Sequence, residues 1–190
     1  LGNIFIARKV GGGKSNAIGI IIGQALEQSV QVWYMSVGYA PVDEDGLDIE
    51  PLIQRCAKIA IDPDAHGLDG LQMLRDACNL VDVRKRIAIE QKVAYFDPVL
   101  IVGEELKALQ ASLNLLVKLK APGCENVLDE ASGRMEYILS TGRKYNVNYM
   151  IAAQDGQSQT VKMSQGTLGN IEVRLAHPSL DLASKRNLLP

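Results

Sequence analysis

Three consecutive glycines followed by Lys14 and Ser15 constrain this chain more than any other segment of its sequence. The apolar run Asn3–Ala7 precedes them and predicts a buried strand, whereas Lys14–Gln28 has a composition that suits a helix. Glycines let backbone N–H groups turn inward toward an anion, and the N-terminus of the following helix adds partial positive charge. A strand, a glycine turn, Lys-Ser and a helix in this order predict a phosphate-binding P-loop.

The predicted P-loop assigns a role to each of its polar side chains. Lys14 is expected to reach the β- and γ-phosphates of ATP, and the Ser15 hydroxyl is expected to ligate Mg²⁺. The full pattern, G-x-x-x-x-G-K-[ST], has its first glycine at position 8, where this chain has Arg8. The alternative is a glycine-rich turn followed by a surface lysine, which the order of the four elements disfavours. The predicted nucleotide-binding residues are Gly11, Gly12, Gly13, Lys14, Ser15 and Asn16.

A second signal is an apolar run that ends in two carboxylates. Val99–Val102 is typical of a strand buried on both faces, and Gly103, Glu104 and Glu105 follow it. In this context Glu104 is the candidate Mg²⁺ ligand, and Glu105 is the candidate general base that orients the attacking water. The alternative is the acidic N-terminus of a helix, which the helix dipole favours. That alternative is the better one for the segment alone, but the upstream P-loop favours the catalytic interpretation.

Further strands and helices are expected in alternation along the chain. This alternation predicts an α/β fold with a mostly parallel sheet and helices on both faces, in one domain over residues 1–190. Pro51–Ile61 suits a short helix and also a strand over Ile59–Ile61. The expected strands are Val30–Val37, Val99–Val102, Val147–Ala153 and Ile171–Ala176; the helices are Leu68–Val93, Glu104–Lys120, Val127–Arg143 and Leu180–Leu189; the loops include Gly38–Asp48 and Asp155–Gln165.

Composition narrows the classes of protein that remain. The net charge of −2 excludes binding of nucleic acid by bulk charge, but it allows a local contact on a neutral body. The three cysteines and two histidines are widely spaced, so neither a metal cluster nor a disulfide framework is indicated, and reduced thiols fit a cytoplasmic protein. No apolar run reaches the roughly 18 residues that span a bilayer. Because the chain lacks an initiator Met, we expect it to be part of a longer protein.

A third signal is the segment Gly142–Tyr145, the strand Val147–Ala153 and then Gln154. From the residues alone, Arg143 and Lys144 are best explained as the basic end of a helix. In sequence order, however, GGGKSN, IVGEEL, GRKYNVNYMIAAQ, NIEVRLA and SKRNLL resemble the FtsK/HerA superfamily of P-loop DNA motors. The resemblance covers nearly the whole chain, from Gly2 to Leu189.

The resemblance implies a three-layer RecA-like P-loop NTPase that couples ATP hydrolysis to movement along double-stranded DNA. It implies ATP and Mg²⁺ as cofactors and a homo-oligomeric ring, of six subunits in this family, with accessory or membrane-anchoring domains outside this chain. It also implies functions for single residues. These are Glu104 and Glu105 as the acidic pair, Gln154 as the polar sensor, Arg143 as a finger that acts on a neighbouring subunit, and Arg174 and Arg186 near subunit contacts.

Basic groups that could contact DNA are few. The candidates are Lys162 and the cluster Arg84-Lys85-Arg86, for which a solvated helix end is at least as good an explanation.

Departures from the family pattern motivate a second hypothesis. Arg8 replaces a glycine, Glu104 replaces the usual Asp, and Asp155-Gly156 stands where the translocases tend to have Arg-Pro. These departures would suit a non-hydrolysing or weakly active nucleotide-binding subunit of a DNA-processing or DNA-transfer complex. A small-molecule kinase is a third option, which the paired acids and the absence of an Arg-rich lid segment disfavour.

Overall fold

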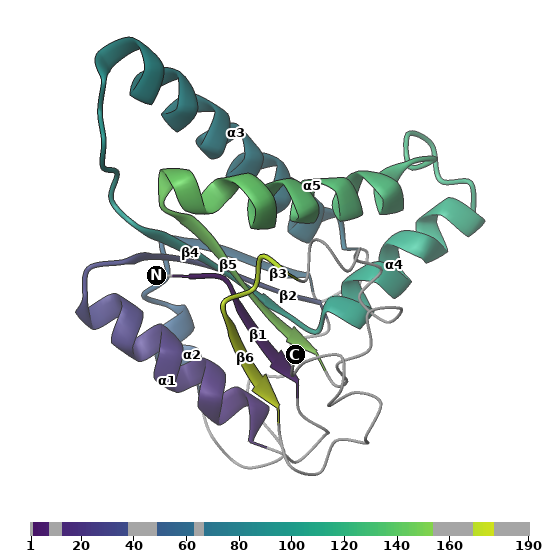
Figure 1. The fold of residues 1–190 in the computed structure, drawn as a ribbon. Helices are drawn as coiled ribbons and strands as arrows, with labels where there is room; N and C mark the ends of the chain where they lie inside the picture. The colour runs from purple at the N-terminus through teal and green to yellow at the C-terminus, as the bar shows by residue number, and fades with distance from the viewer. Residues whose placement is uncertain (1, 8–12, 38–48, 63–66, 154–168, 177–190) are drawn as a thin grey trace.

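A computed structural model describes residues 2–7, 13–37, 49–62, 67–153 and 169–176 of the chain (Figure 1). The strands are β1 (Ile4–Ala7), β2 (Gln31–Val37), β3 (Lys58–Asp62), β4 (Val99–Glu104), β5 (Val147–Ala153) and β6 (Val173–Ala176). The helices are α1 (Lys14–Glu27), α2 (Glu50–Ile53), α3 (Leu68–Gln91), α4 (Leu106–Lys118) and α5 (Val127–Thr141), followed by a 3₁₀ turn, η1 (Gly142–Tyr145). Within these residues, no helix has both the length and the apolar character needed to cross a lipid bilayer.

The strands form one sheet in the order β3-β2-β4-β5-β1-β6, and each pair of neighbours is parallel. The carboxyl ends of the strands therefore meet at one edge of the sheet, which we call the carboxyl edge; the opposite one is the amino edge. The predicted P-loop strand, β1, and the predicted acidic strand, β4, are not neighbours, because β5 lies between them. The sequence-based expectation of an α/β fold with a parallel sheet is confirmed.

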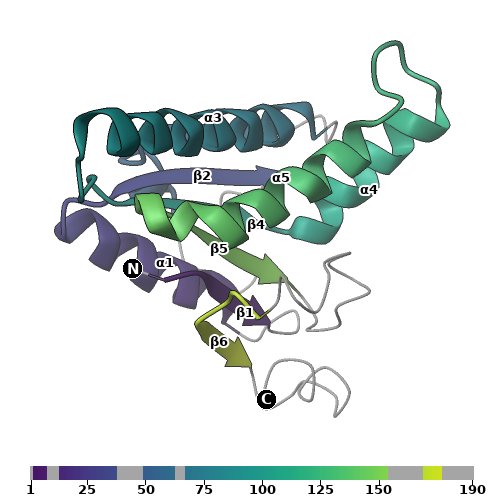
Figure 2. The ribbon, with the colours of Figure 1, turned by 45° about the horizontal axis from the view of Figure 1, so that its top comes forward.

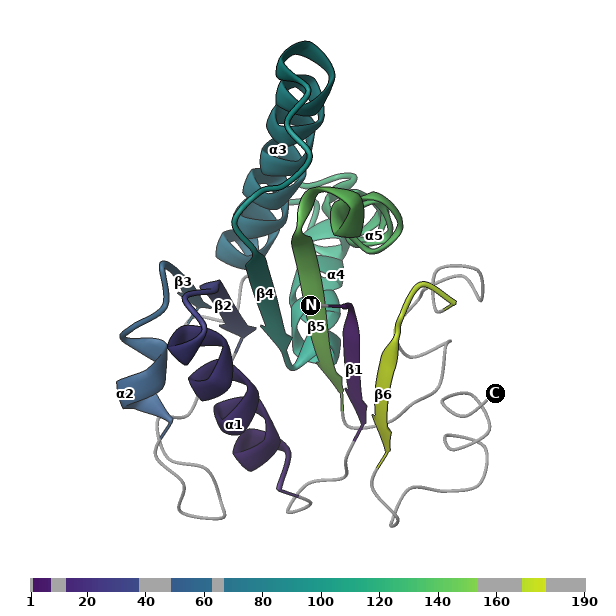
Figure 3. The ribbon, with the colours of Figure 1, turned by 60° about the vertical axis from the view of Figure 1, so that its left-hand side comes forward.

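Helices cover both faces of this sheet. Figures 2 and 3 show α1 on one face and α3 and α5 on the other. Side chains alternate accordingly along β4, where Leu100 and Val102 pack into the cluster beneath α1 and Ile101 packs into the cluster beneath α3, α4 and α5. Burial on both faces explains why the VLIV run is continuously apolar.

Several element boundaries differ from the sequence-based expectation, most clearly at three places. Pro51–Ile61 divides into the end of α2 and the start of β3, so both interpretations hold for part of it. Glu104 ends β4 instead of beginning a helix, and α4 starts at Leu106. The helix expected to reach Arg143 ends at Thr141, and η1 begins at Gly142, where a Cβ would lie only 2.5 Å from the carbonyl oxygen of Val147.

Other sequence-based expectations lie outside the described residues. These are the loops Gly38–Asp48 and Asp155–Gln165, the helix Leu180–Leu189, and the single residues Arg8, Gly11, Gly12, Gln154, Lys162 and Arg186.

Arg84 is a structural residue and not part of an exposed basic cluster. Its side chain is buried and donates hydrogen bonds to the carbonyl oxygens of Tyr145 (2.8 Å) and Asn146 (3.3 Å). Its guanidinium carbon also lies 5.4 Å from the centroid of the Phe96 ring, within range of a cation–π interaction. Of the predicted cluster, only Lys85 and Arg86 are exposed, so Arg84 is withdrawn as a candidate for DNA contact.

Glu130 links the two long helices on the α3–α5 face. Its carboxylate accepts hydrogen bonds from Arg75 of α3 (2.8 Å) and from Arg134 (2.7 Å) one turn along α5. The hydrogen bond from Arg75 is the main cause that lowers the pKa of Glu130 to about 2, and Arg134 contributes further. Glu130 is therefore ionised at neutral pH.

Candidate nucleotide-binding site

The N-terminus of α1 suits the phosphate-binding role predicted for it. Gly13, directly before the helix, has a φ of 70°, a left-handed conformation that glycine adopts without steric cost. Lys14 and Ser15 form the first turn, and Ser15 is buried whereas Asn16 is exposed. In the described part of the chain, no acidic side chain lies in this first turn and no side chain caps the helix. No acidic residue of the helix itself therefore opposes the binding of an anion at this end.

The fold brings Lys14 and Glu105 into direct contact, although 91 residues separate them. The Lys14 ammonium donates a hydrogen bond to Oε1 of Glu105, and the two side chains are only 12% and 27% exposed. This ion pair connects the predicted P-loop with the predicted general base at the carboxyl edge.

A left-handed turn places Glu105 at this position. Its φ is 53°, which non-glycine residues adopt rarely, and it directly follows the last residue of β4. Its carbonyl oxygen accepts a hydrogen bond from the backbone N–H of Ala108 (2.8 Å), so Glu105 also starts α4. Backbone conformations of this kind occur preferentially at functional sites.

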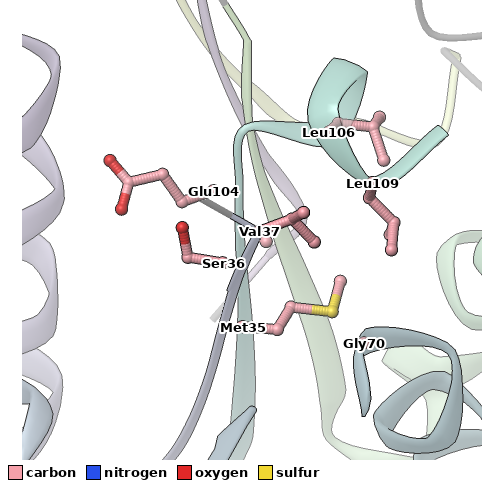
Figure 4. Close-up of a pocket in the computed structure, with 8 residues that line it drawn as sticks. Met35, Ser36, Val37, Gly70, Glu104, Leu106 and Leu109 are labelled. Carbon is pink, nitrogen blue, oxygen red and sulfur yellow. The ribbon is translucent and has the colours of Figure 1, made fainter. Parts of the chain in front are cut away.

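Glu104 is held from the neighbouring strand β2. The Tyr34 hydroxyl donates a hydrogen bond to Oε2 of Glu104, and Ser36 is the register partner of Glu104. Figure 4 shows the oxygens of Ser36 and Glu104 on one side of the sheet and the side chains of Met35 and Leu109 on the other. No sequence motif points to Tyr34 or Ser36. The alternation along β2 places Val32, Tyr34 and Ser36 on one face, but it does not give their register against β4, on which the contact with Glu104 depends.

The donor set at this edge fits Mg²⁺ in a complex with phosphate. The Ser15 hydroxyl and the Glu104 carboxylate could supply hard oxygen ligands, which Mg²⁺ prefers. Among the described residues, no group of three or more His, Cys, Asp or Glu side chains could hold a metal ion by itself. A cation here would thus need phosphate and water oxygens to complete its shell, as is usual for Mg²⁺ in nucleotide sites.

Arg143 lies away from the carboxyl edge. It belongs to η1, which precedes β5, and therefore sits near the amino edge of the sheet. Its guanidinium forms an ion pair with Glu172, and its side chain is 65% exposed. The structure does not bring Arg143 together with Lys14 and Glu105 of the same chain. Arg174 lies on the edge strand β6, also outside this site.

Behind β4, on the α3–α5 face, lies a small apolar pocket that Met35, Gly70, Gly103 and Leu109 help to line. Gly103 is required here, because a Cβ at this position would lie 2.6 Å from the Tyr149 hydroxyl. That hydroxyl is buried without a hydrogen-bond partner among the described residues, and burial raises the pKa of Tyr149.

Comparisons with known proteins agree with this architecture at the level of the fold. No family model and no curated protein sequence matches the chain. Among solved structures, the conjugation coupling protein TcpA of pCW3, in its monomer form with ATPγS, aligns with a TM-score of 0.69 and 17% identity. The cytoplasmic domain of the type VII secretion ATPase EccC from Thermomonospora curvata aligns with a TM-score of 0.66 and 16% identity.

This chain has the fold of TcpA and of EccC. The alignments cover 99% and 98% of the chain, but only 52% of the TcpA chain and 22% of the EccC chain. The chain therefore corresponds to about half of TcpA and to about a fifth of EccC, and the fold expected from the sequence resemblance is confirmed.

Proposed function

We propose that this chain binds ATP with Mg²⁺ and hydrolyses it as the core of a motor that moves along double-stranded DNA. The observation that carries the proposal is the contact between Lys14 and Glu105, which joins the two predicted catalytic segments at the carboxyl edge of the sheet. Glu104 directly precedes Glu105 in the chain, and β5, the strand that leads to Gln154, runs between β1 and β4. A glycine turn, a lysine and two carboxylates at one edge suit phosphoryl transfer to water.

Each residue has a separate task in this mechanism. Lys14 leaves Glu105 and binds the γ-phosphate, and Glu105, then free of the ammonium, orients the attacking water. Ser15 and Glu104 would hold Mg²⁺, which neutralises charge that develops on the phosphate oxygens. Gln154 follows β5 and is proposed to contact the γ-phosphate and to respond to its loss.

Movement along DNA is the further part of the proposal. It is supported by the fold shared with TcpA, a conjugation coupling protein, and by the sequence resemblance to DNA motors. A ring, which we propose to be a hexamer, needs only a few basic groups per subunit at its centre, and this is compatible with the net charge of −2. Lys85 and Arg86 are exposed candidates.

Steady-state ATP turnover, measured with and without duplex DNA, tests the proposal. Lys14→Ala and Glu105→Gln are expected to abolish turnover, whereas Lys118→Ala and Glu125→Gln, which change exposed residues away from the site, should retain it. The mass of the assembly with and without ATP tests ring formation. Turnover near the wild-type rate in either site variant would contradict the assignment.

The proposed role of Arg143 in a neighbouring subunit is tested by mixing two inactive variants. Lys14→Ala subunits still supply Arg143, and Arg143→Ala subunits still supply Lys14, so mixed rings contain some complete sites. Restored turnover in the mixture is expected, and its absence would exclude action across the interface.

A second candidate function is a nucleotide-binding assembly subunit that does not hydrolyse ATP. The contact between Lys14 and Glu105 is compatible with it, because each of these two side chains is paired with the other in this structure. ATP binding without any turnover, with and without DNA, would support this second candidate.

A further inference from the structure

The buried hydroxyl of Tyr34 contacts the carboxylate that the proposed function assigns to Mg²⁺. Tyr34 is 0% exposed in β2, and its hydroxyl donates a hydrogen bond to Oε2 of Glu104. The register pairs Tyr34 with Val102, so the phenol reaches along the sheet to Glu104, the next residue of β4 on the same face.

Packing fixes the position of the Tyr34 ring. The ring belongs to the apolar cluster beneath α1, together with Ile18, Val102 and Met150. A tyrosine side chain has two torsions to order, and burial in this cluster holds both. Its hydroxyl is therefore a preorganised donor.

Glu104 needs such a donor more than a shorter acid would. A glutamate has three side-chain torsions, and holding its carboxylate in one orientation costs rotamer entropy. A hydrogen bond to one oxygen from a fixed partner removes part of that freedom before a cation binds. A carboxylate has about four acceptor positions, so the bond from Tyr34 leaves room for a cation on the remaining ones.

We propose that Tyr34 is a positioning residue that orients the Glu104 carboxylate for Mg²⁺. The inference rests on the proposed function, because it assumes that Glu104 ligates the cation. Tyr34 acts through Glu104 and does not touch the nucleotide. Outer hydrogen bonds of this kind orient metal ligands in many sites, and their loss lowers metal affinity about 10–100-fold.

The chain offers a matched control for the hydroxyl of Tyr34. Tyr149 of β5 is equally buried, and its hydroxyl has no hydrogen-bond partner among the described residues. It packs into the cluster on the opposite face of the sheet, beneath α3–α5. Tyr34→Phe and Tyr149→Phe thus remove the same atom from two buried rings, and only the first removal frees Glu104.

The test is a titration of nucleotide binding with Mg²⁺. The purified chain is incubated with a fluorescent ATP analogue, first in EDTA and then at rising Mg²⁺ concentrations, for the wild type, both Tyr→Phe variants and Glu104→Gln. Binding in EDTA should be the same in wild type and Tyr34→Phe. The Mg²⁺ concentration that produces half of the full effect on nucleotide binding is the midpoint of this titration. The midpoint should rise about tenfold in Tyr34→Phe and stay unchanged in Tyr149→Phe. Thermal unfolding in EDTA checks that all variants are folded.

The outcomes separate this inference from the proposed function. If Glu104→Gln keeps the wild-type response to Mg²⁺, the metal role of Glu104 fails, and the role of Tyr34 fails with it. If Glu104→Gln loses the response but Tyr34→Phe keeps the wild-type midpoint, only the role of Tyr34 is overturned. A shift of equal size in Tyr149→Phe would also overturn it, because the effect would then be a general result of altering a buried ring.

A double-variant cycle tests whether Tyr34 acts through Glu104. Adding Tyr34→Phe to Glu104→Gln should cause no further shift in the Mg²⁺ midpoint. A shift as large as in the wild-type background would show a path that bypasses Glu104, and the inference would be wrong.

Discussion

The contact between Lys14 and Glu105 predicts that neutralising Glu105 tightens the binding of ATP. ATP requires the Lys14 ammonium at its phosphates, but in this structure that ammonium is paired with the Glu105 carboxylate. The free energy of ATP binding therefore includes the cost of separating the pair. Glu105→Gln keeps the shape of the side chain and removes the charge, so most of this cost disappears.

The free energy needed to separate Lys14 from Glu105 can be judged from the burial of the two side chains. Exposed ion pairs contribute roughly 0.2–1 kcal/mol, and hydrogen bonds to charged groups contribute roughly 1.5–3 kcal/mol. With side chains that are 12% and 27% exposed, this pair lies between the two classes, at about 1 kcal/mol. Since 1.4 kcal/mol corresponds to about a factor of ten, the Kd for ATP should fall about fivefold.

The assay is calorimetric titration of ATP into wild type and Glu105→Gln in EDTA, which removes any contribution of Mg²⁺. Glu104→Gln is the control, because it also removes one carboxylate at the same edge but this carboxylate is paired with Tyr34. Its effect on the Kd should be smaller. An unchanged or weaker affinity in Glu105→Gln would refute the reasoning. Equal tightening in both variants would attribute the gain to the lost negative charge and not to the release of Lys14.

Three further predictions concern stability, each measured by urea unfolding followed through the fluorescence of the single tryptophan. Arg84→Ala should cost about 2 kcal/mol, because two carbonyl groups lose a charged donor, whereas Lys85→Ala should change the free energy by less than about 0.5 kcal/mol. The lowered pKa of Glu130 stabilises the fold above pH 4.5 and loses this effect as the pH falls toward 2, so Glu130→Gln should show a shallower loss of stability over that window. Gly103→Ala should destabilise by about 1–3 kcal/mol, and less in a Tyr149→Phe background, because the nearest clashing atom is then absent; additive effects would contradict this.

Much of the fold could be predicted because several segments carry unambiguous local patterns. Val99–Val102 is continuously apolar and bounded by Pro98 and Gly103, which suits only a buried strand of this length. Pro51–Ile61 could not be resolved, since it is short and apolar at both ends. Pairing with β2 determines that its second half is a strand, and such tertiary contacts leave no local signal.

The candidate site, too, could be predicted from the sequence only in part. That Lys14 and Glu105 belong to one site could be predicted, because a strand–loop motif and a strand–acid motif in a parallel sheet both end at its carboxyl edge. The contact of Tyr34 with Glu104 could not be predicted, because it depends on the register between β2 and β4. The alternation of side chains within β2 does not encode that register. Arg84 was misjudged for a related reason: its helical neighbours are exposed, and only the segment around Tyr145 and Asn146 makes its position buried.

The parallel topology also restricts what Arg143 can do. Arg143 precedes β5 and lies near the amino edge, while Lys14 and Glu105 meet at the carboxyl edge. β5 has seven residues, and at about 3.3 Å per residue the two edges are roughly 20 Å apart. An arginine side chain cannot extend over that length, so Arg143 cannot reach a phosphate bound at Lys14 of its own chain. Any action of Arg143 on ATP therefore requires a second subunit, and it also requires that Arg143 leave Glu172.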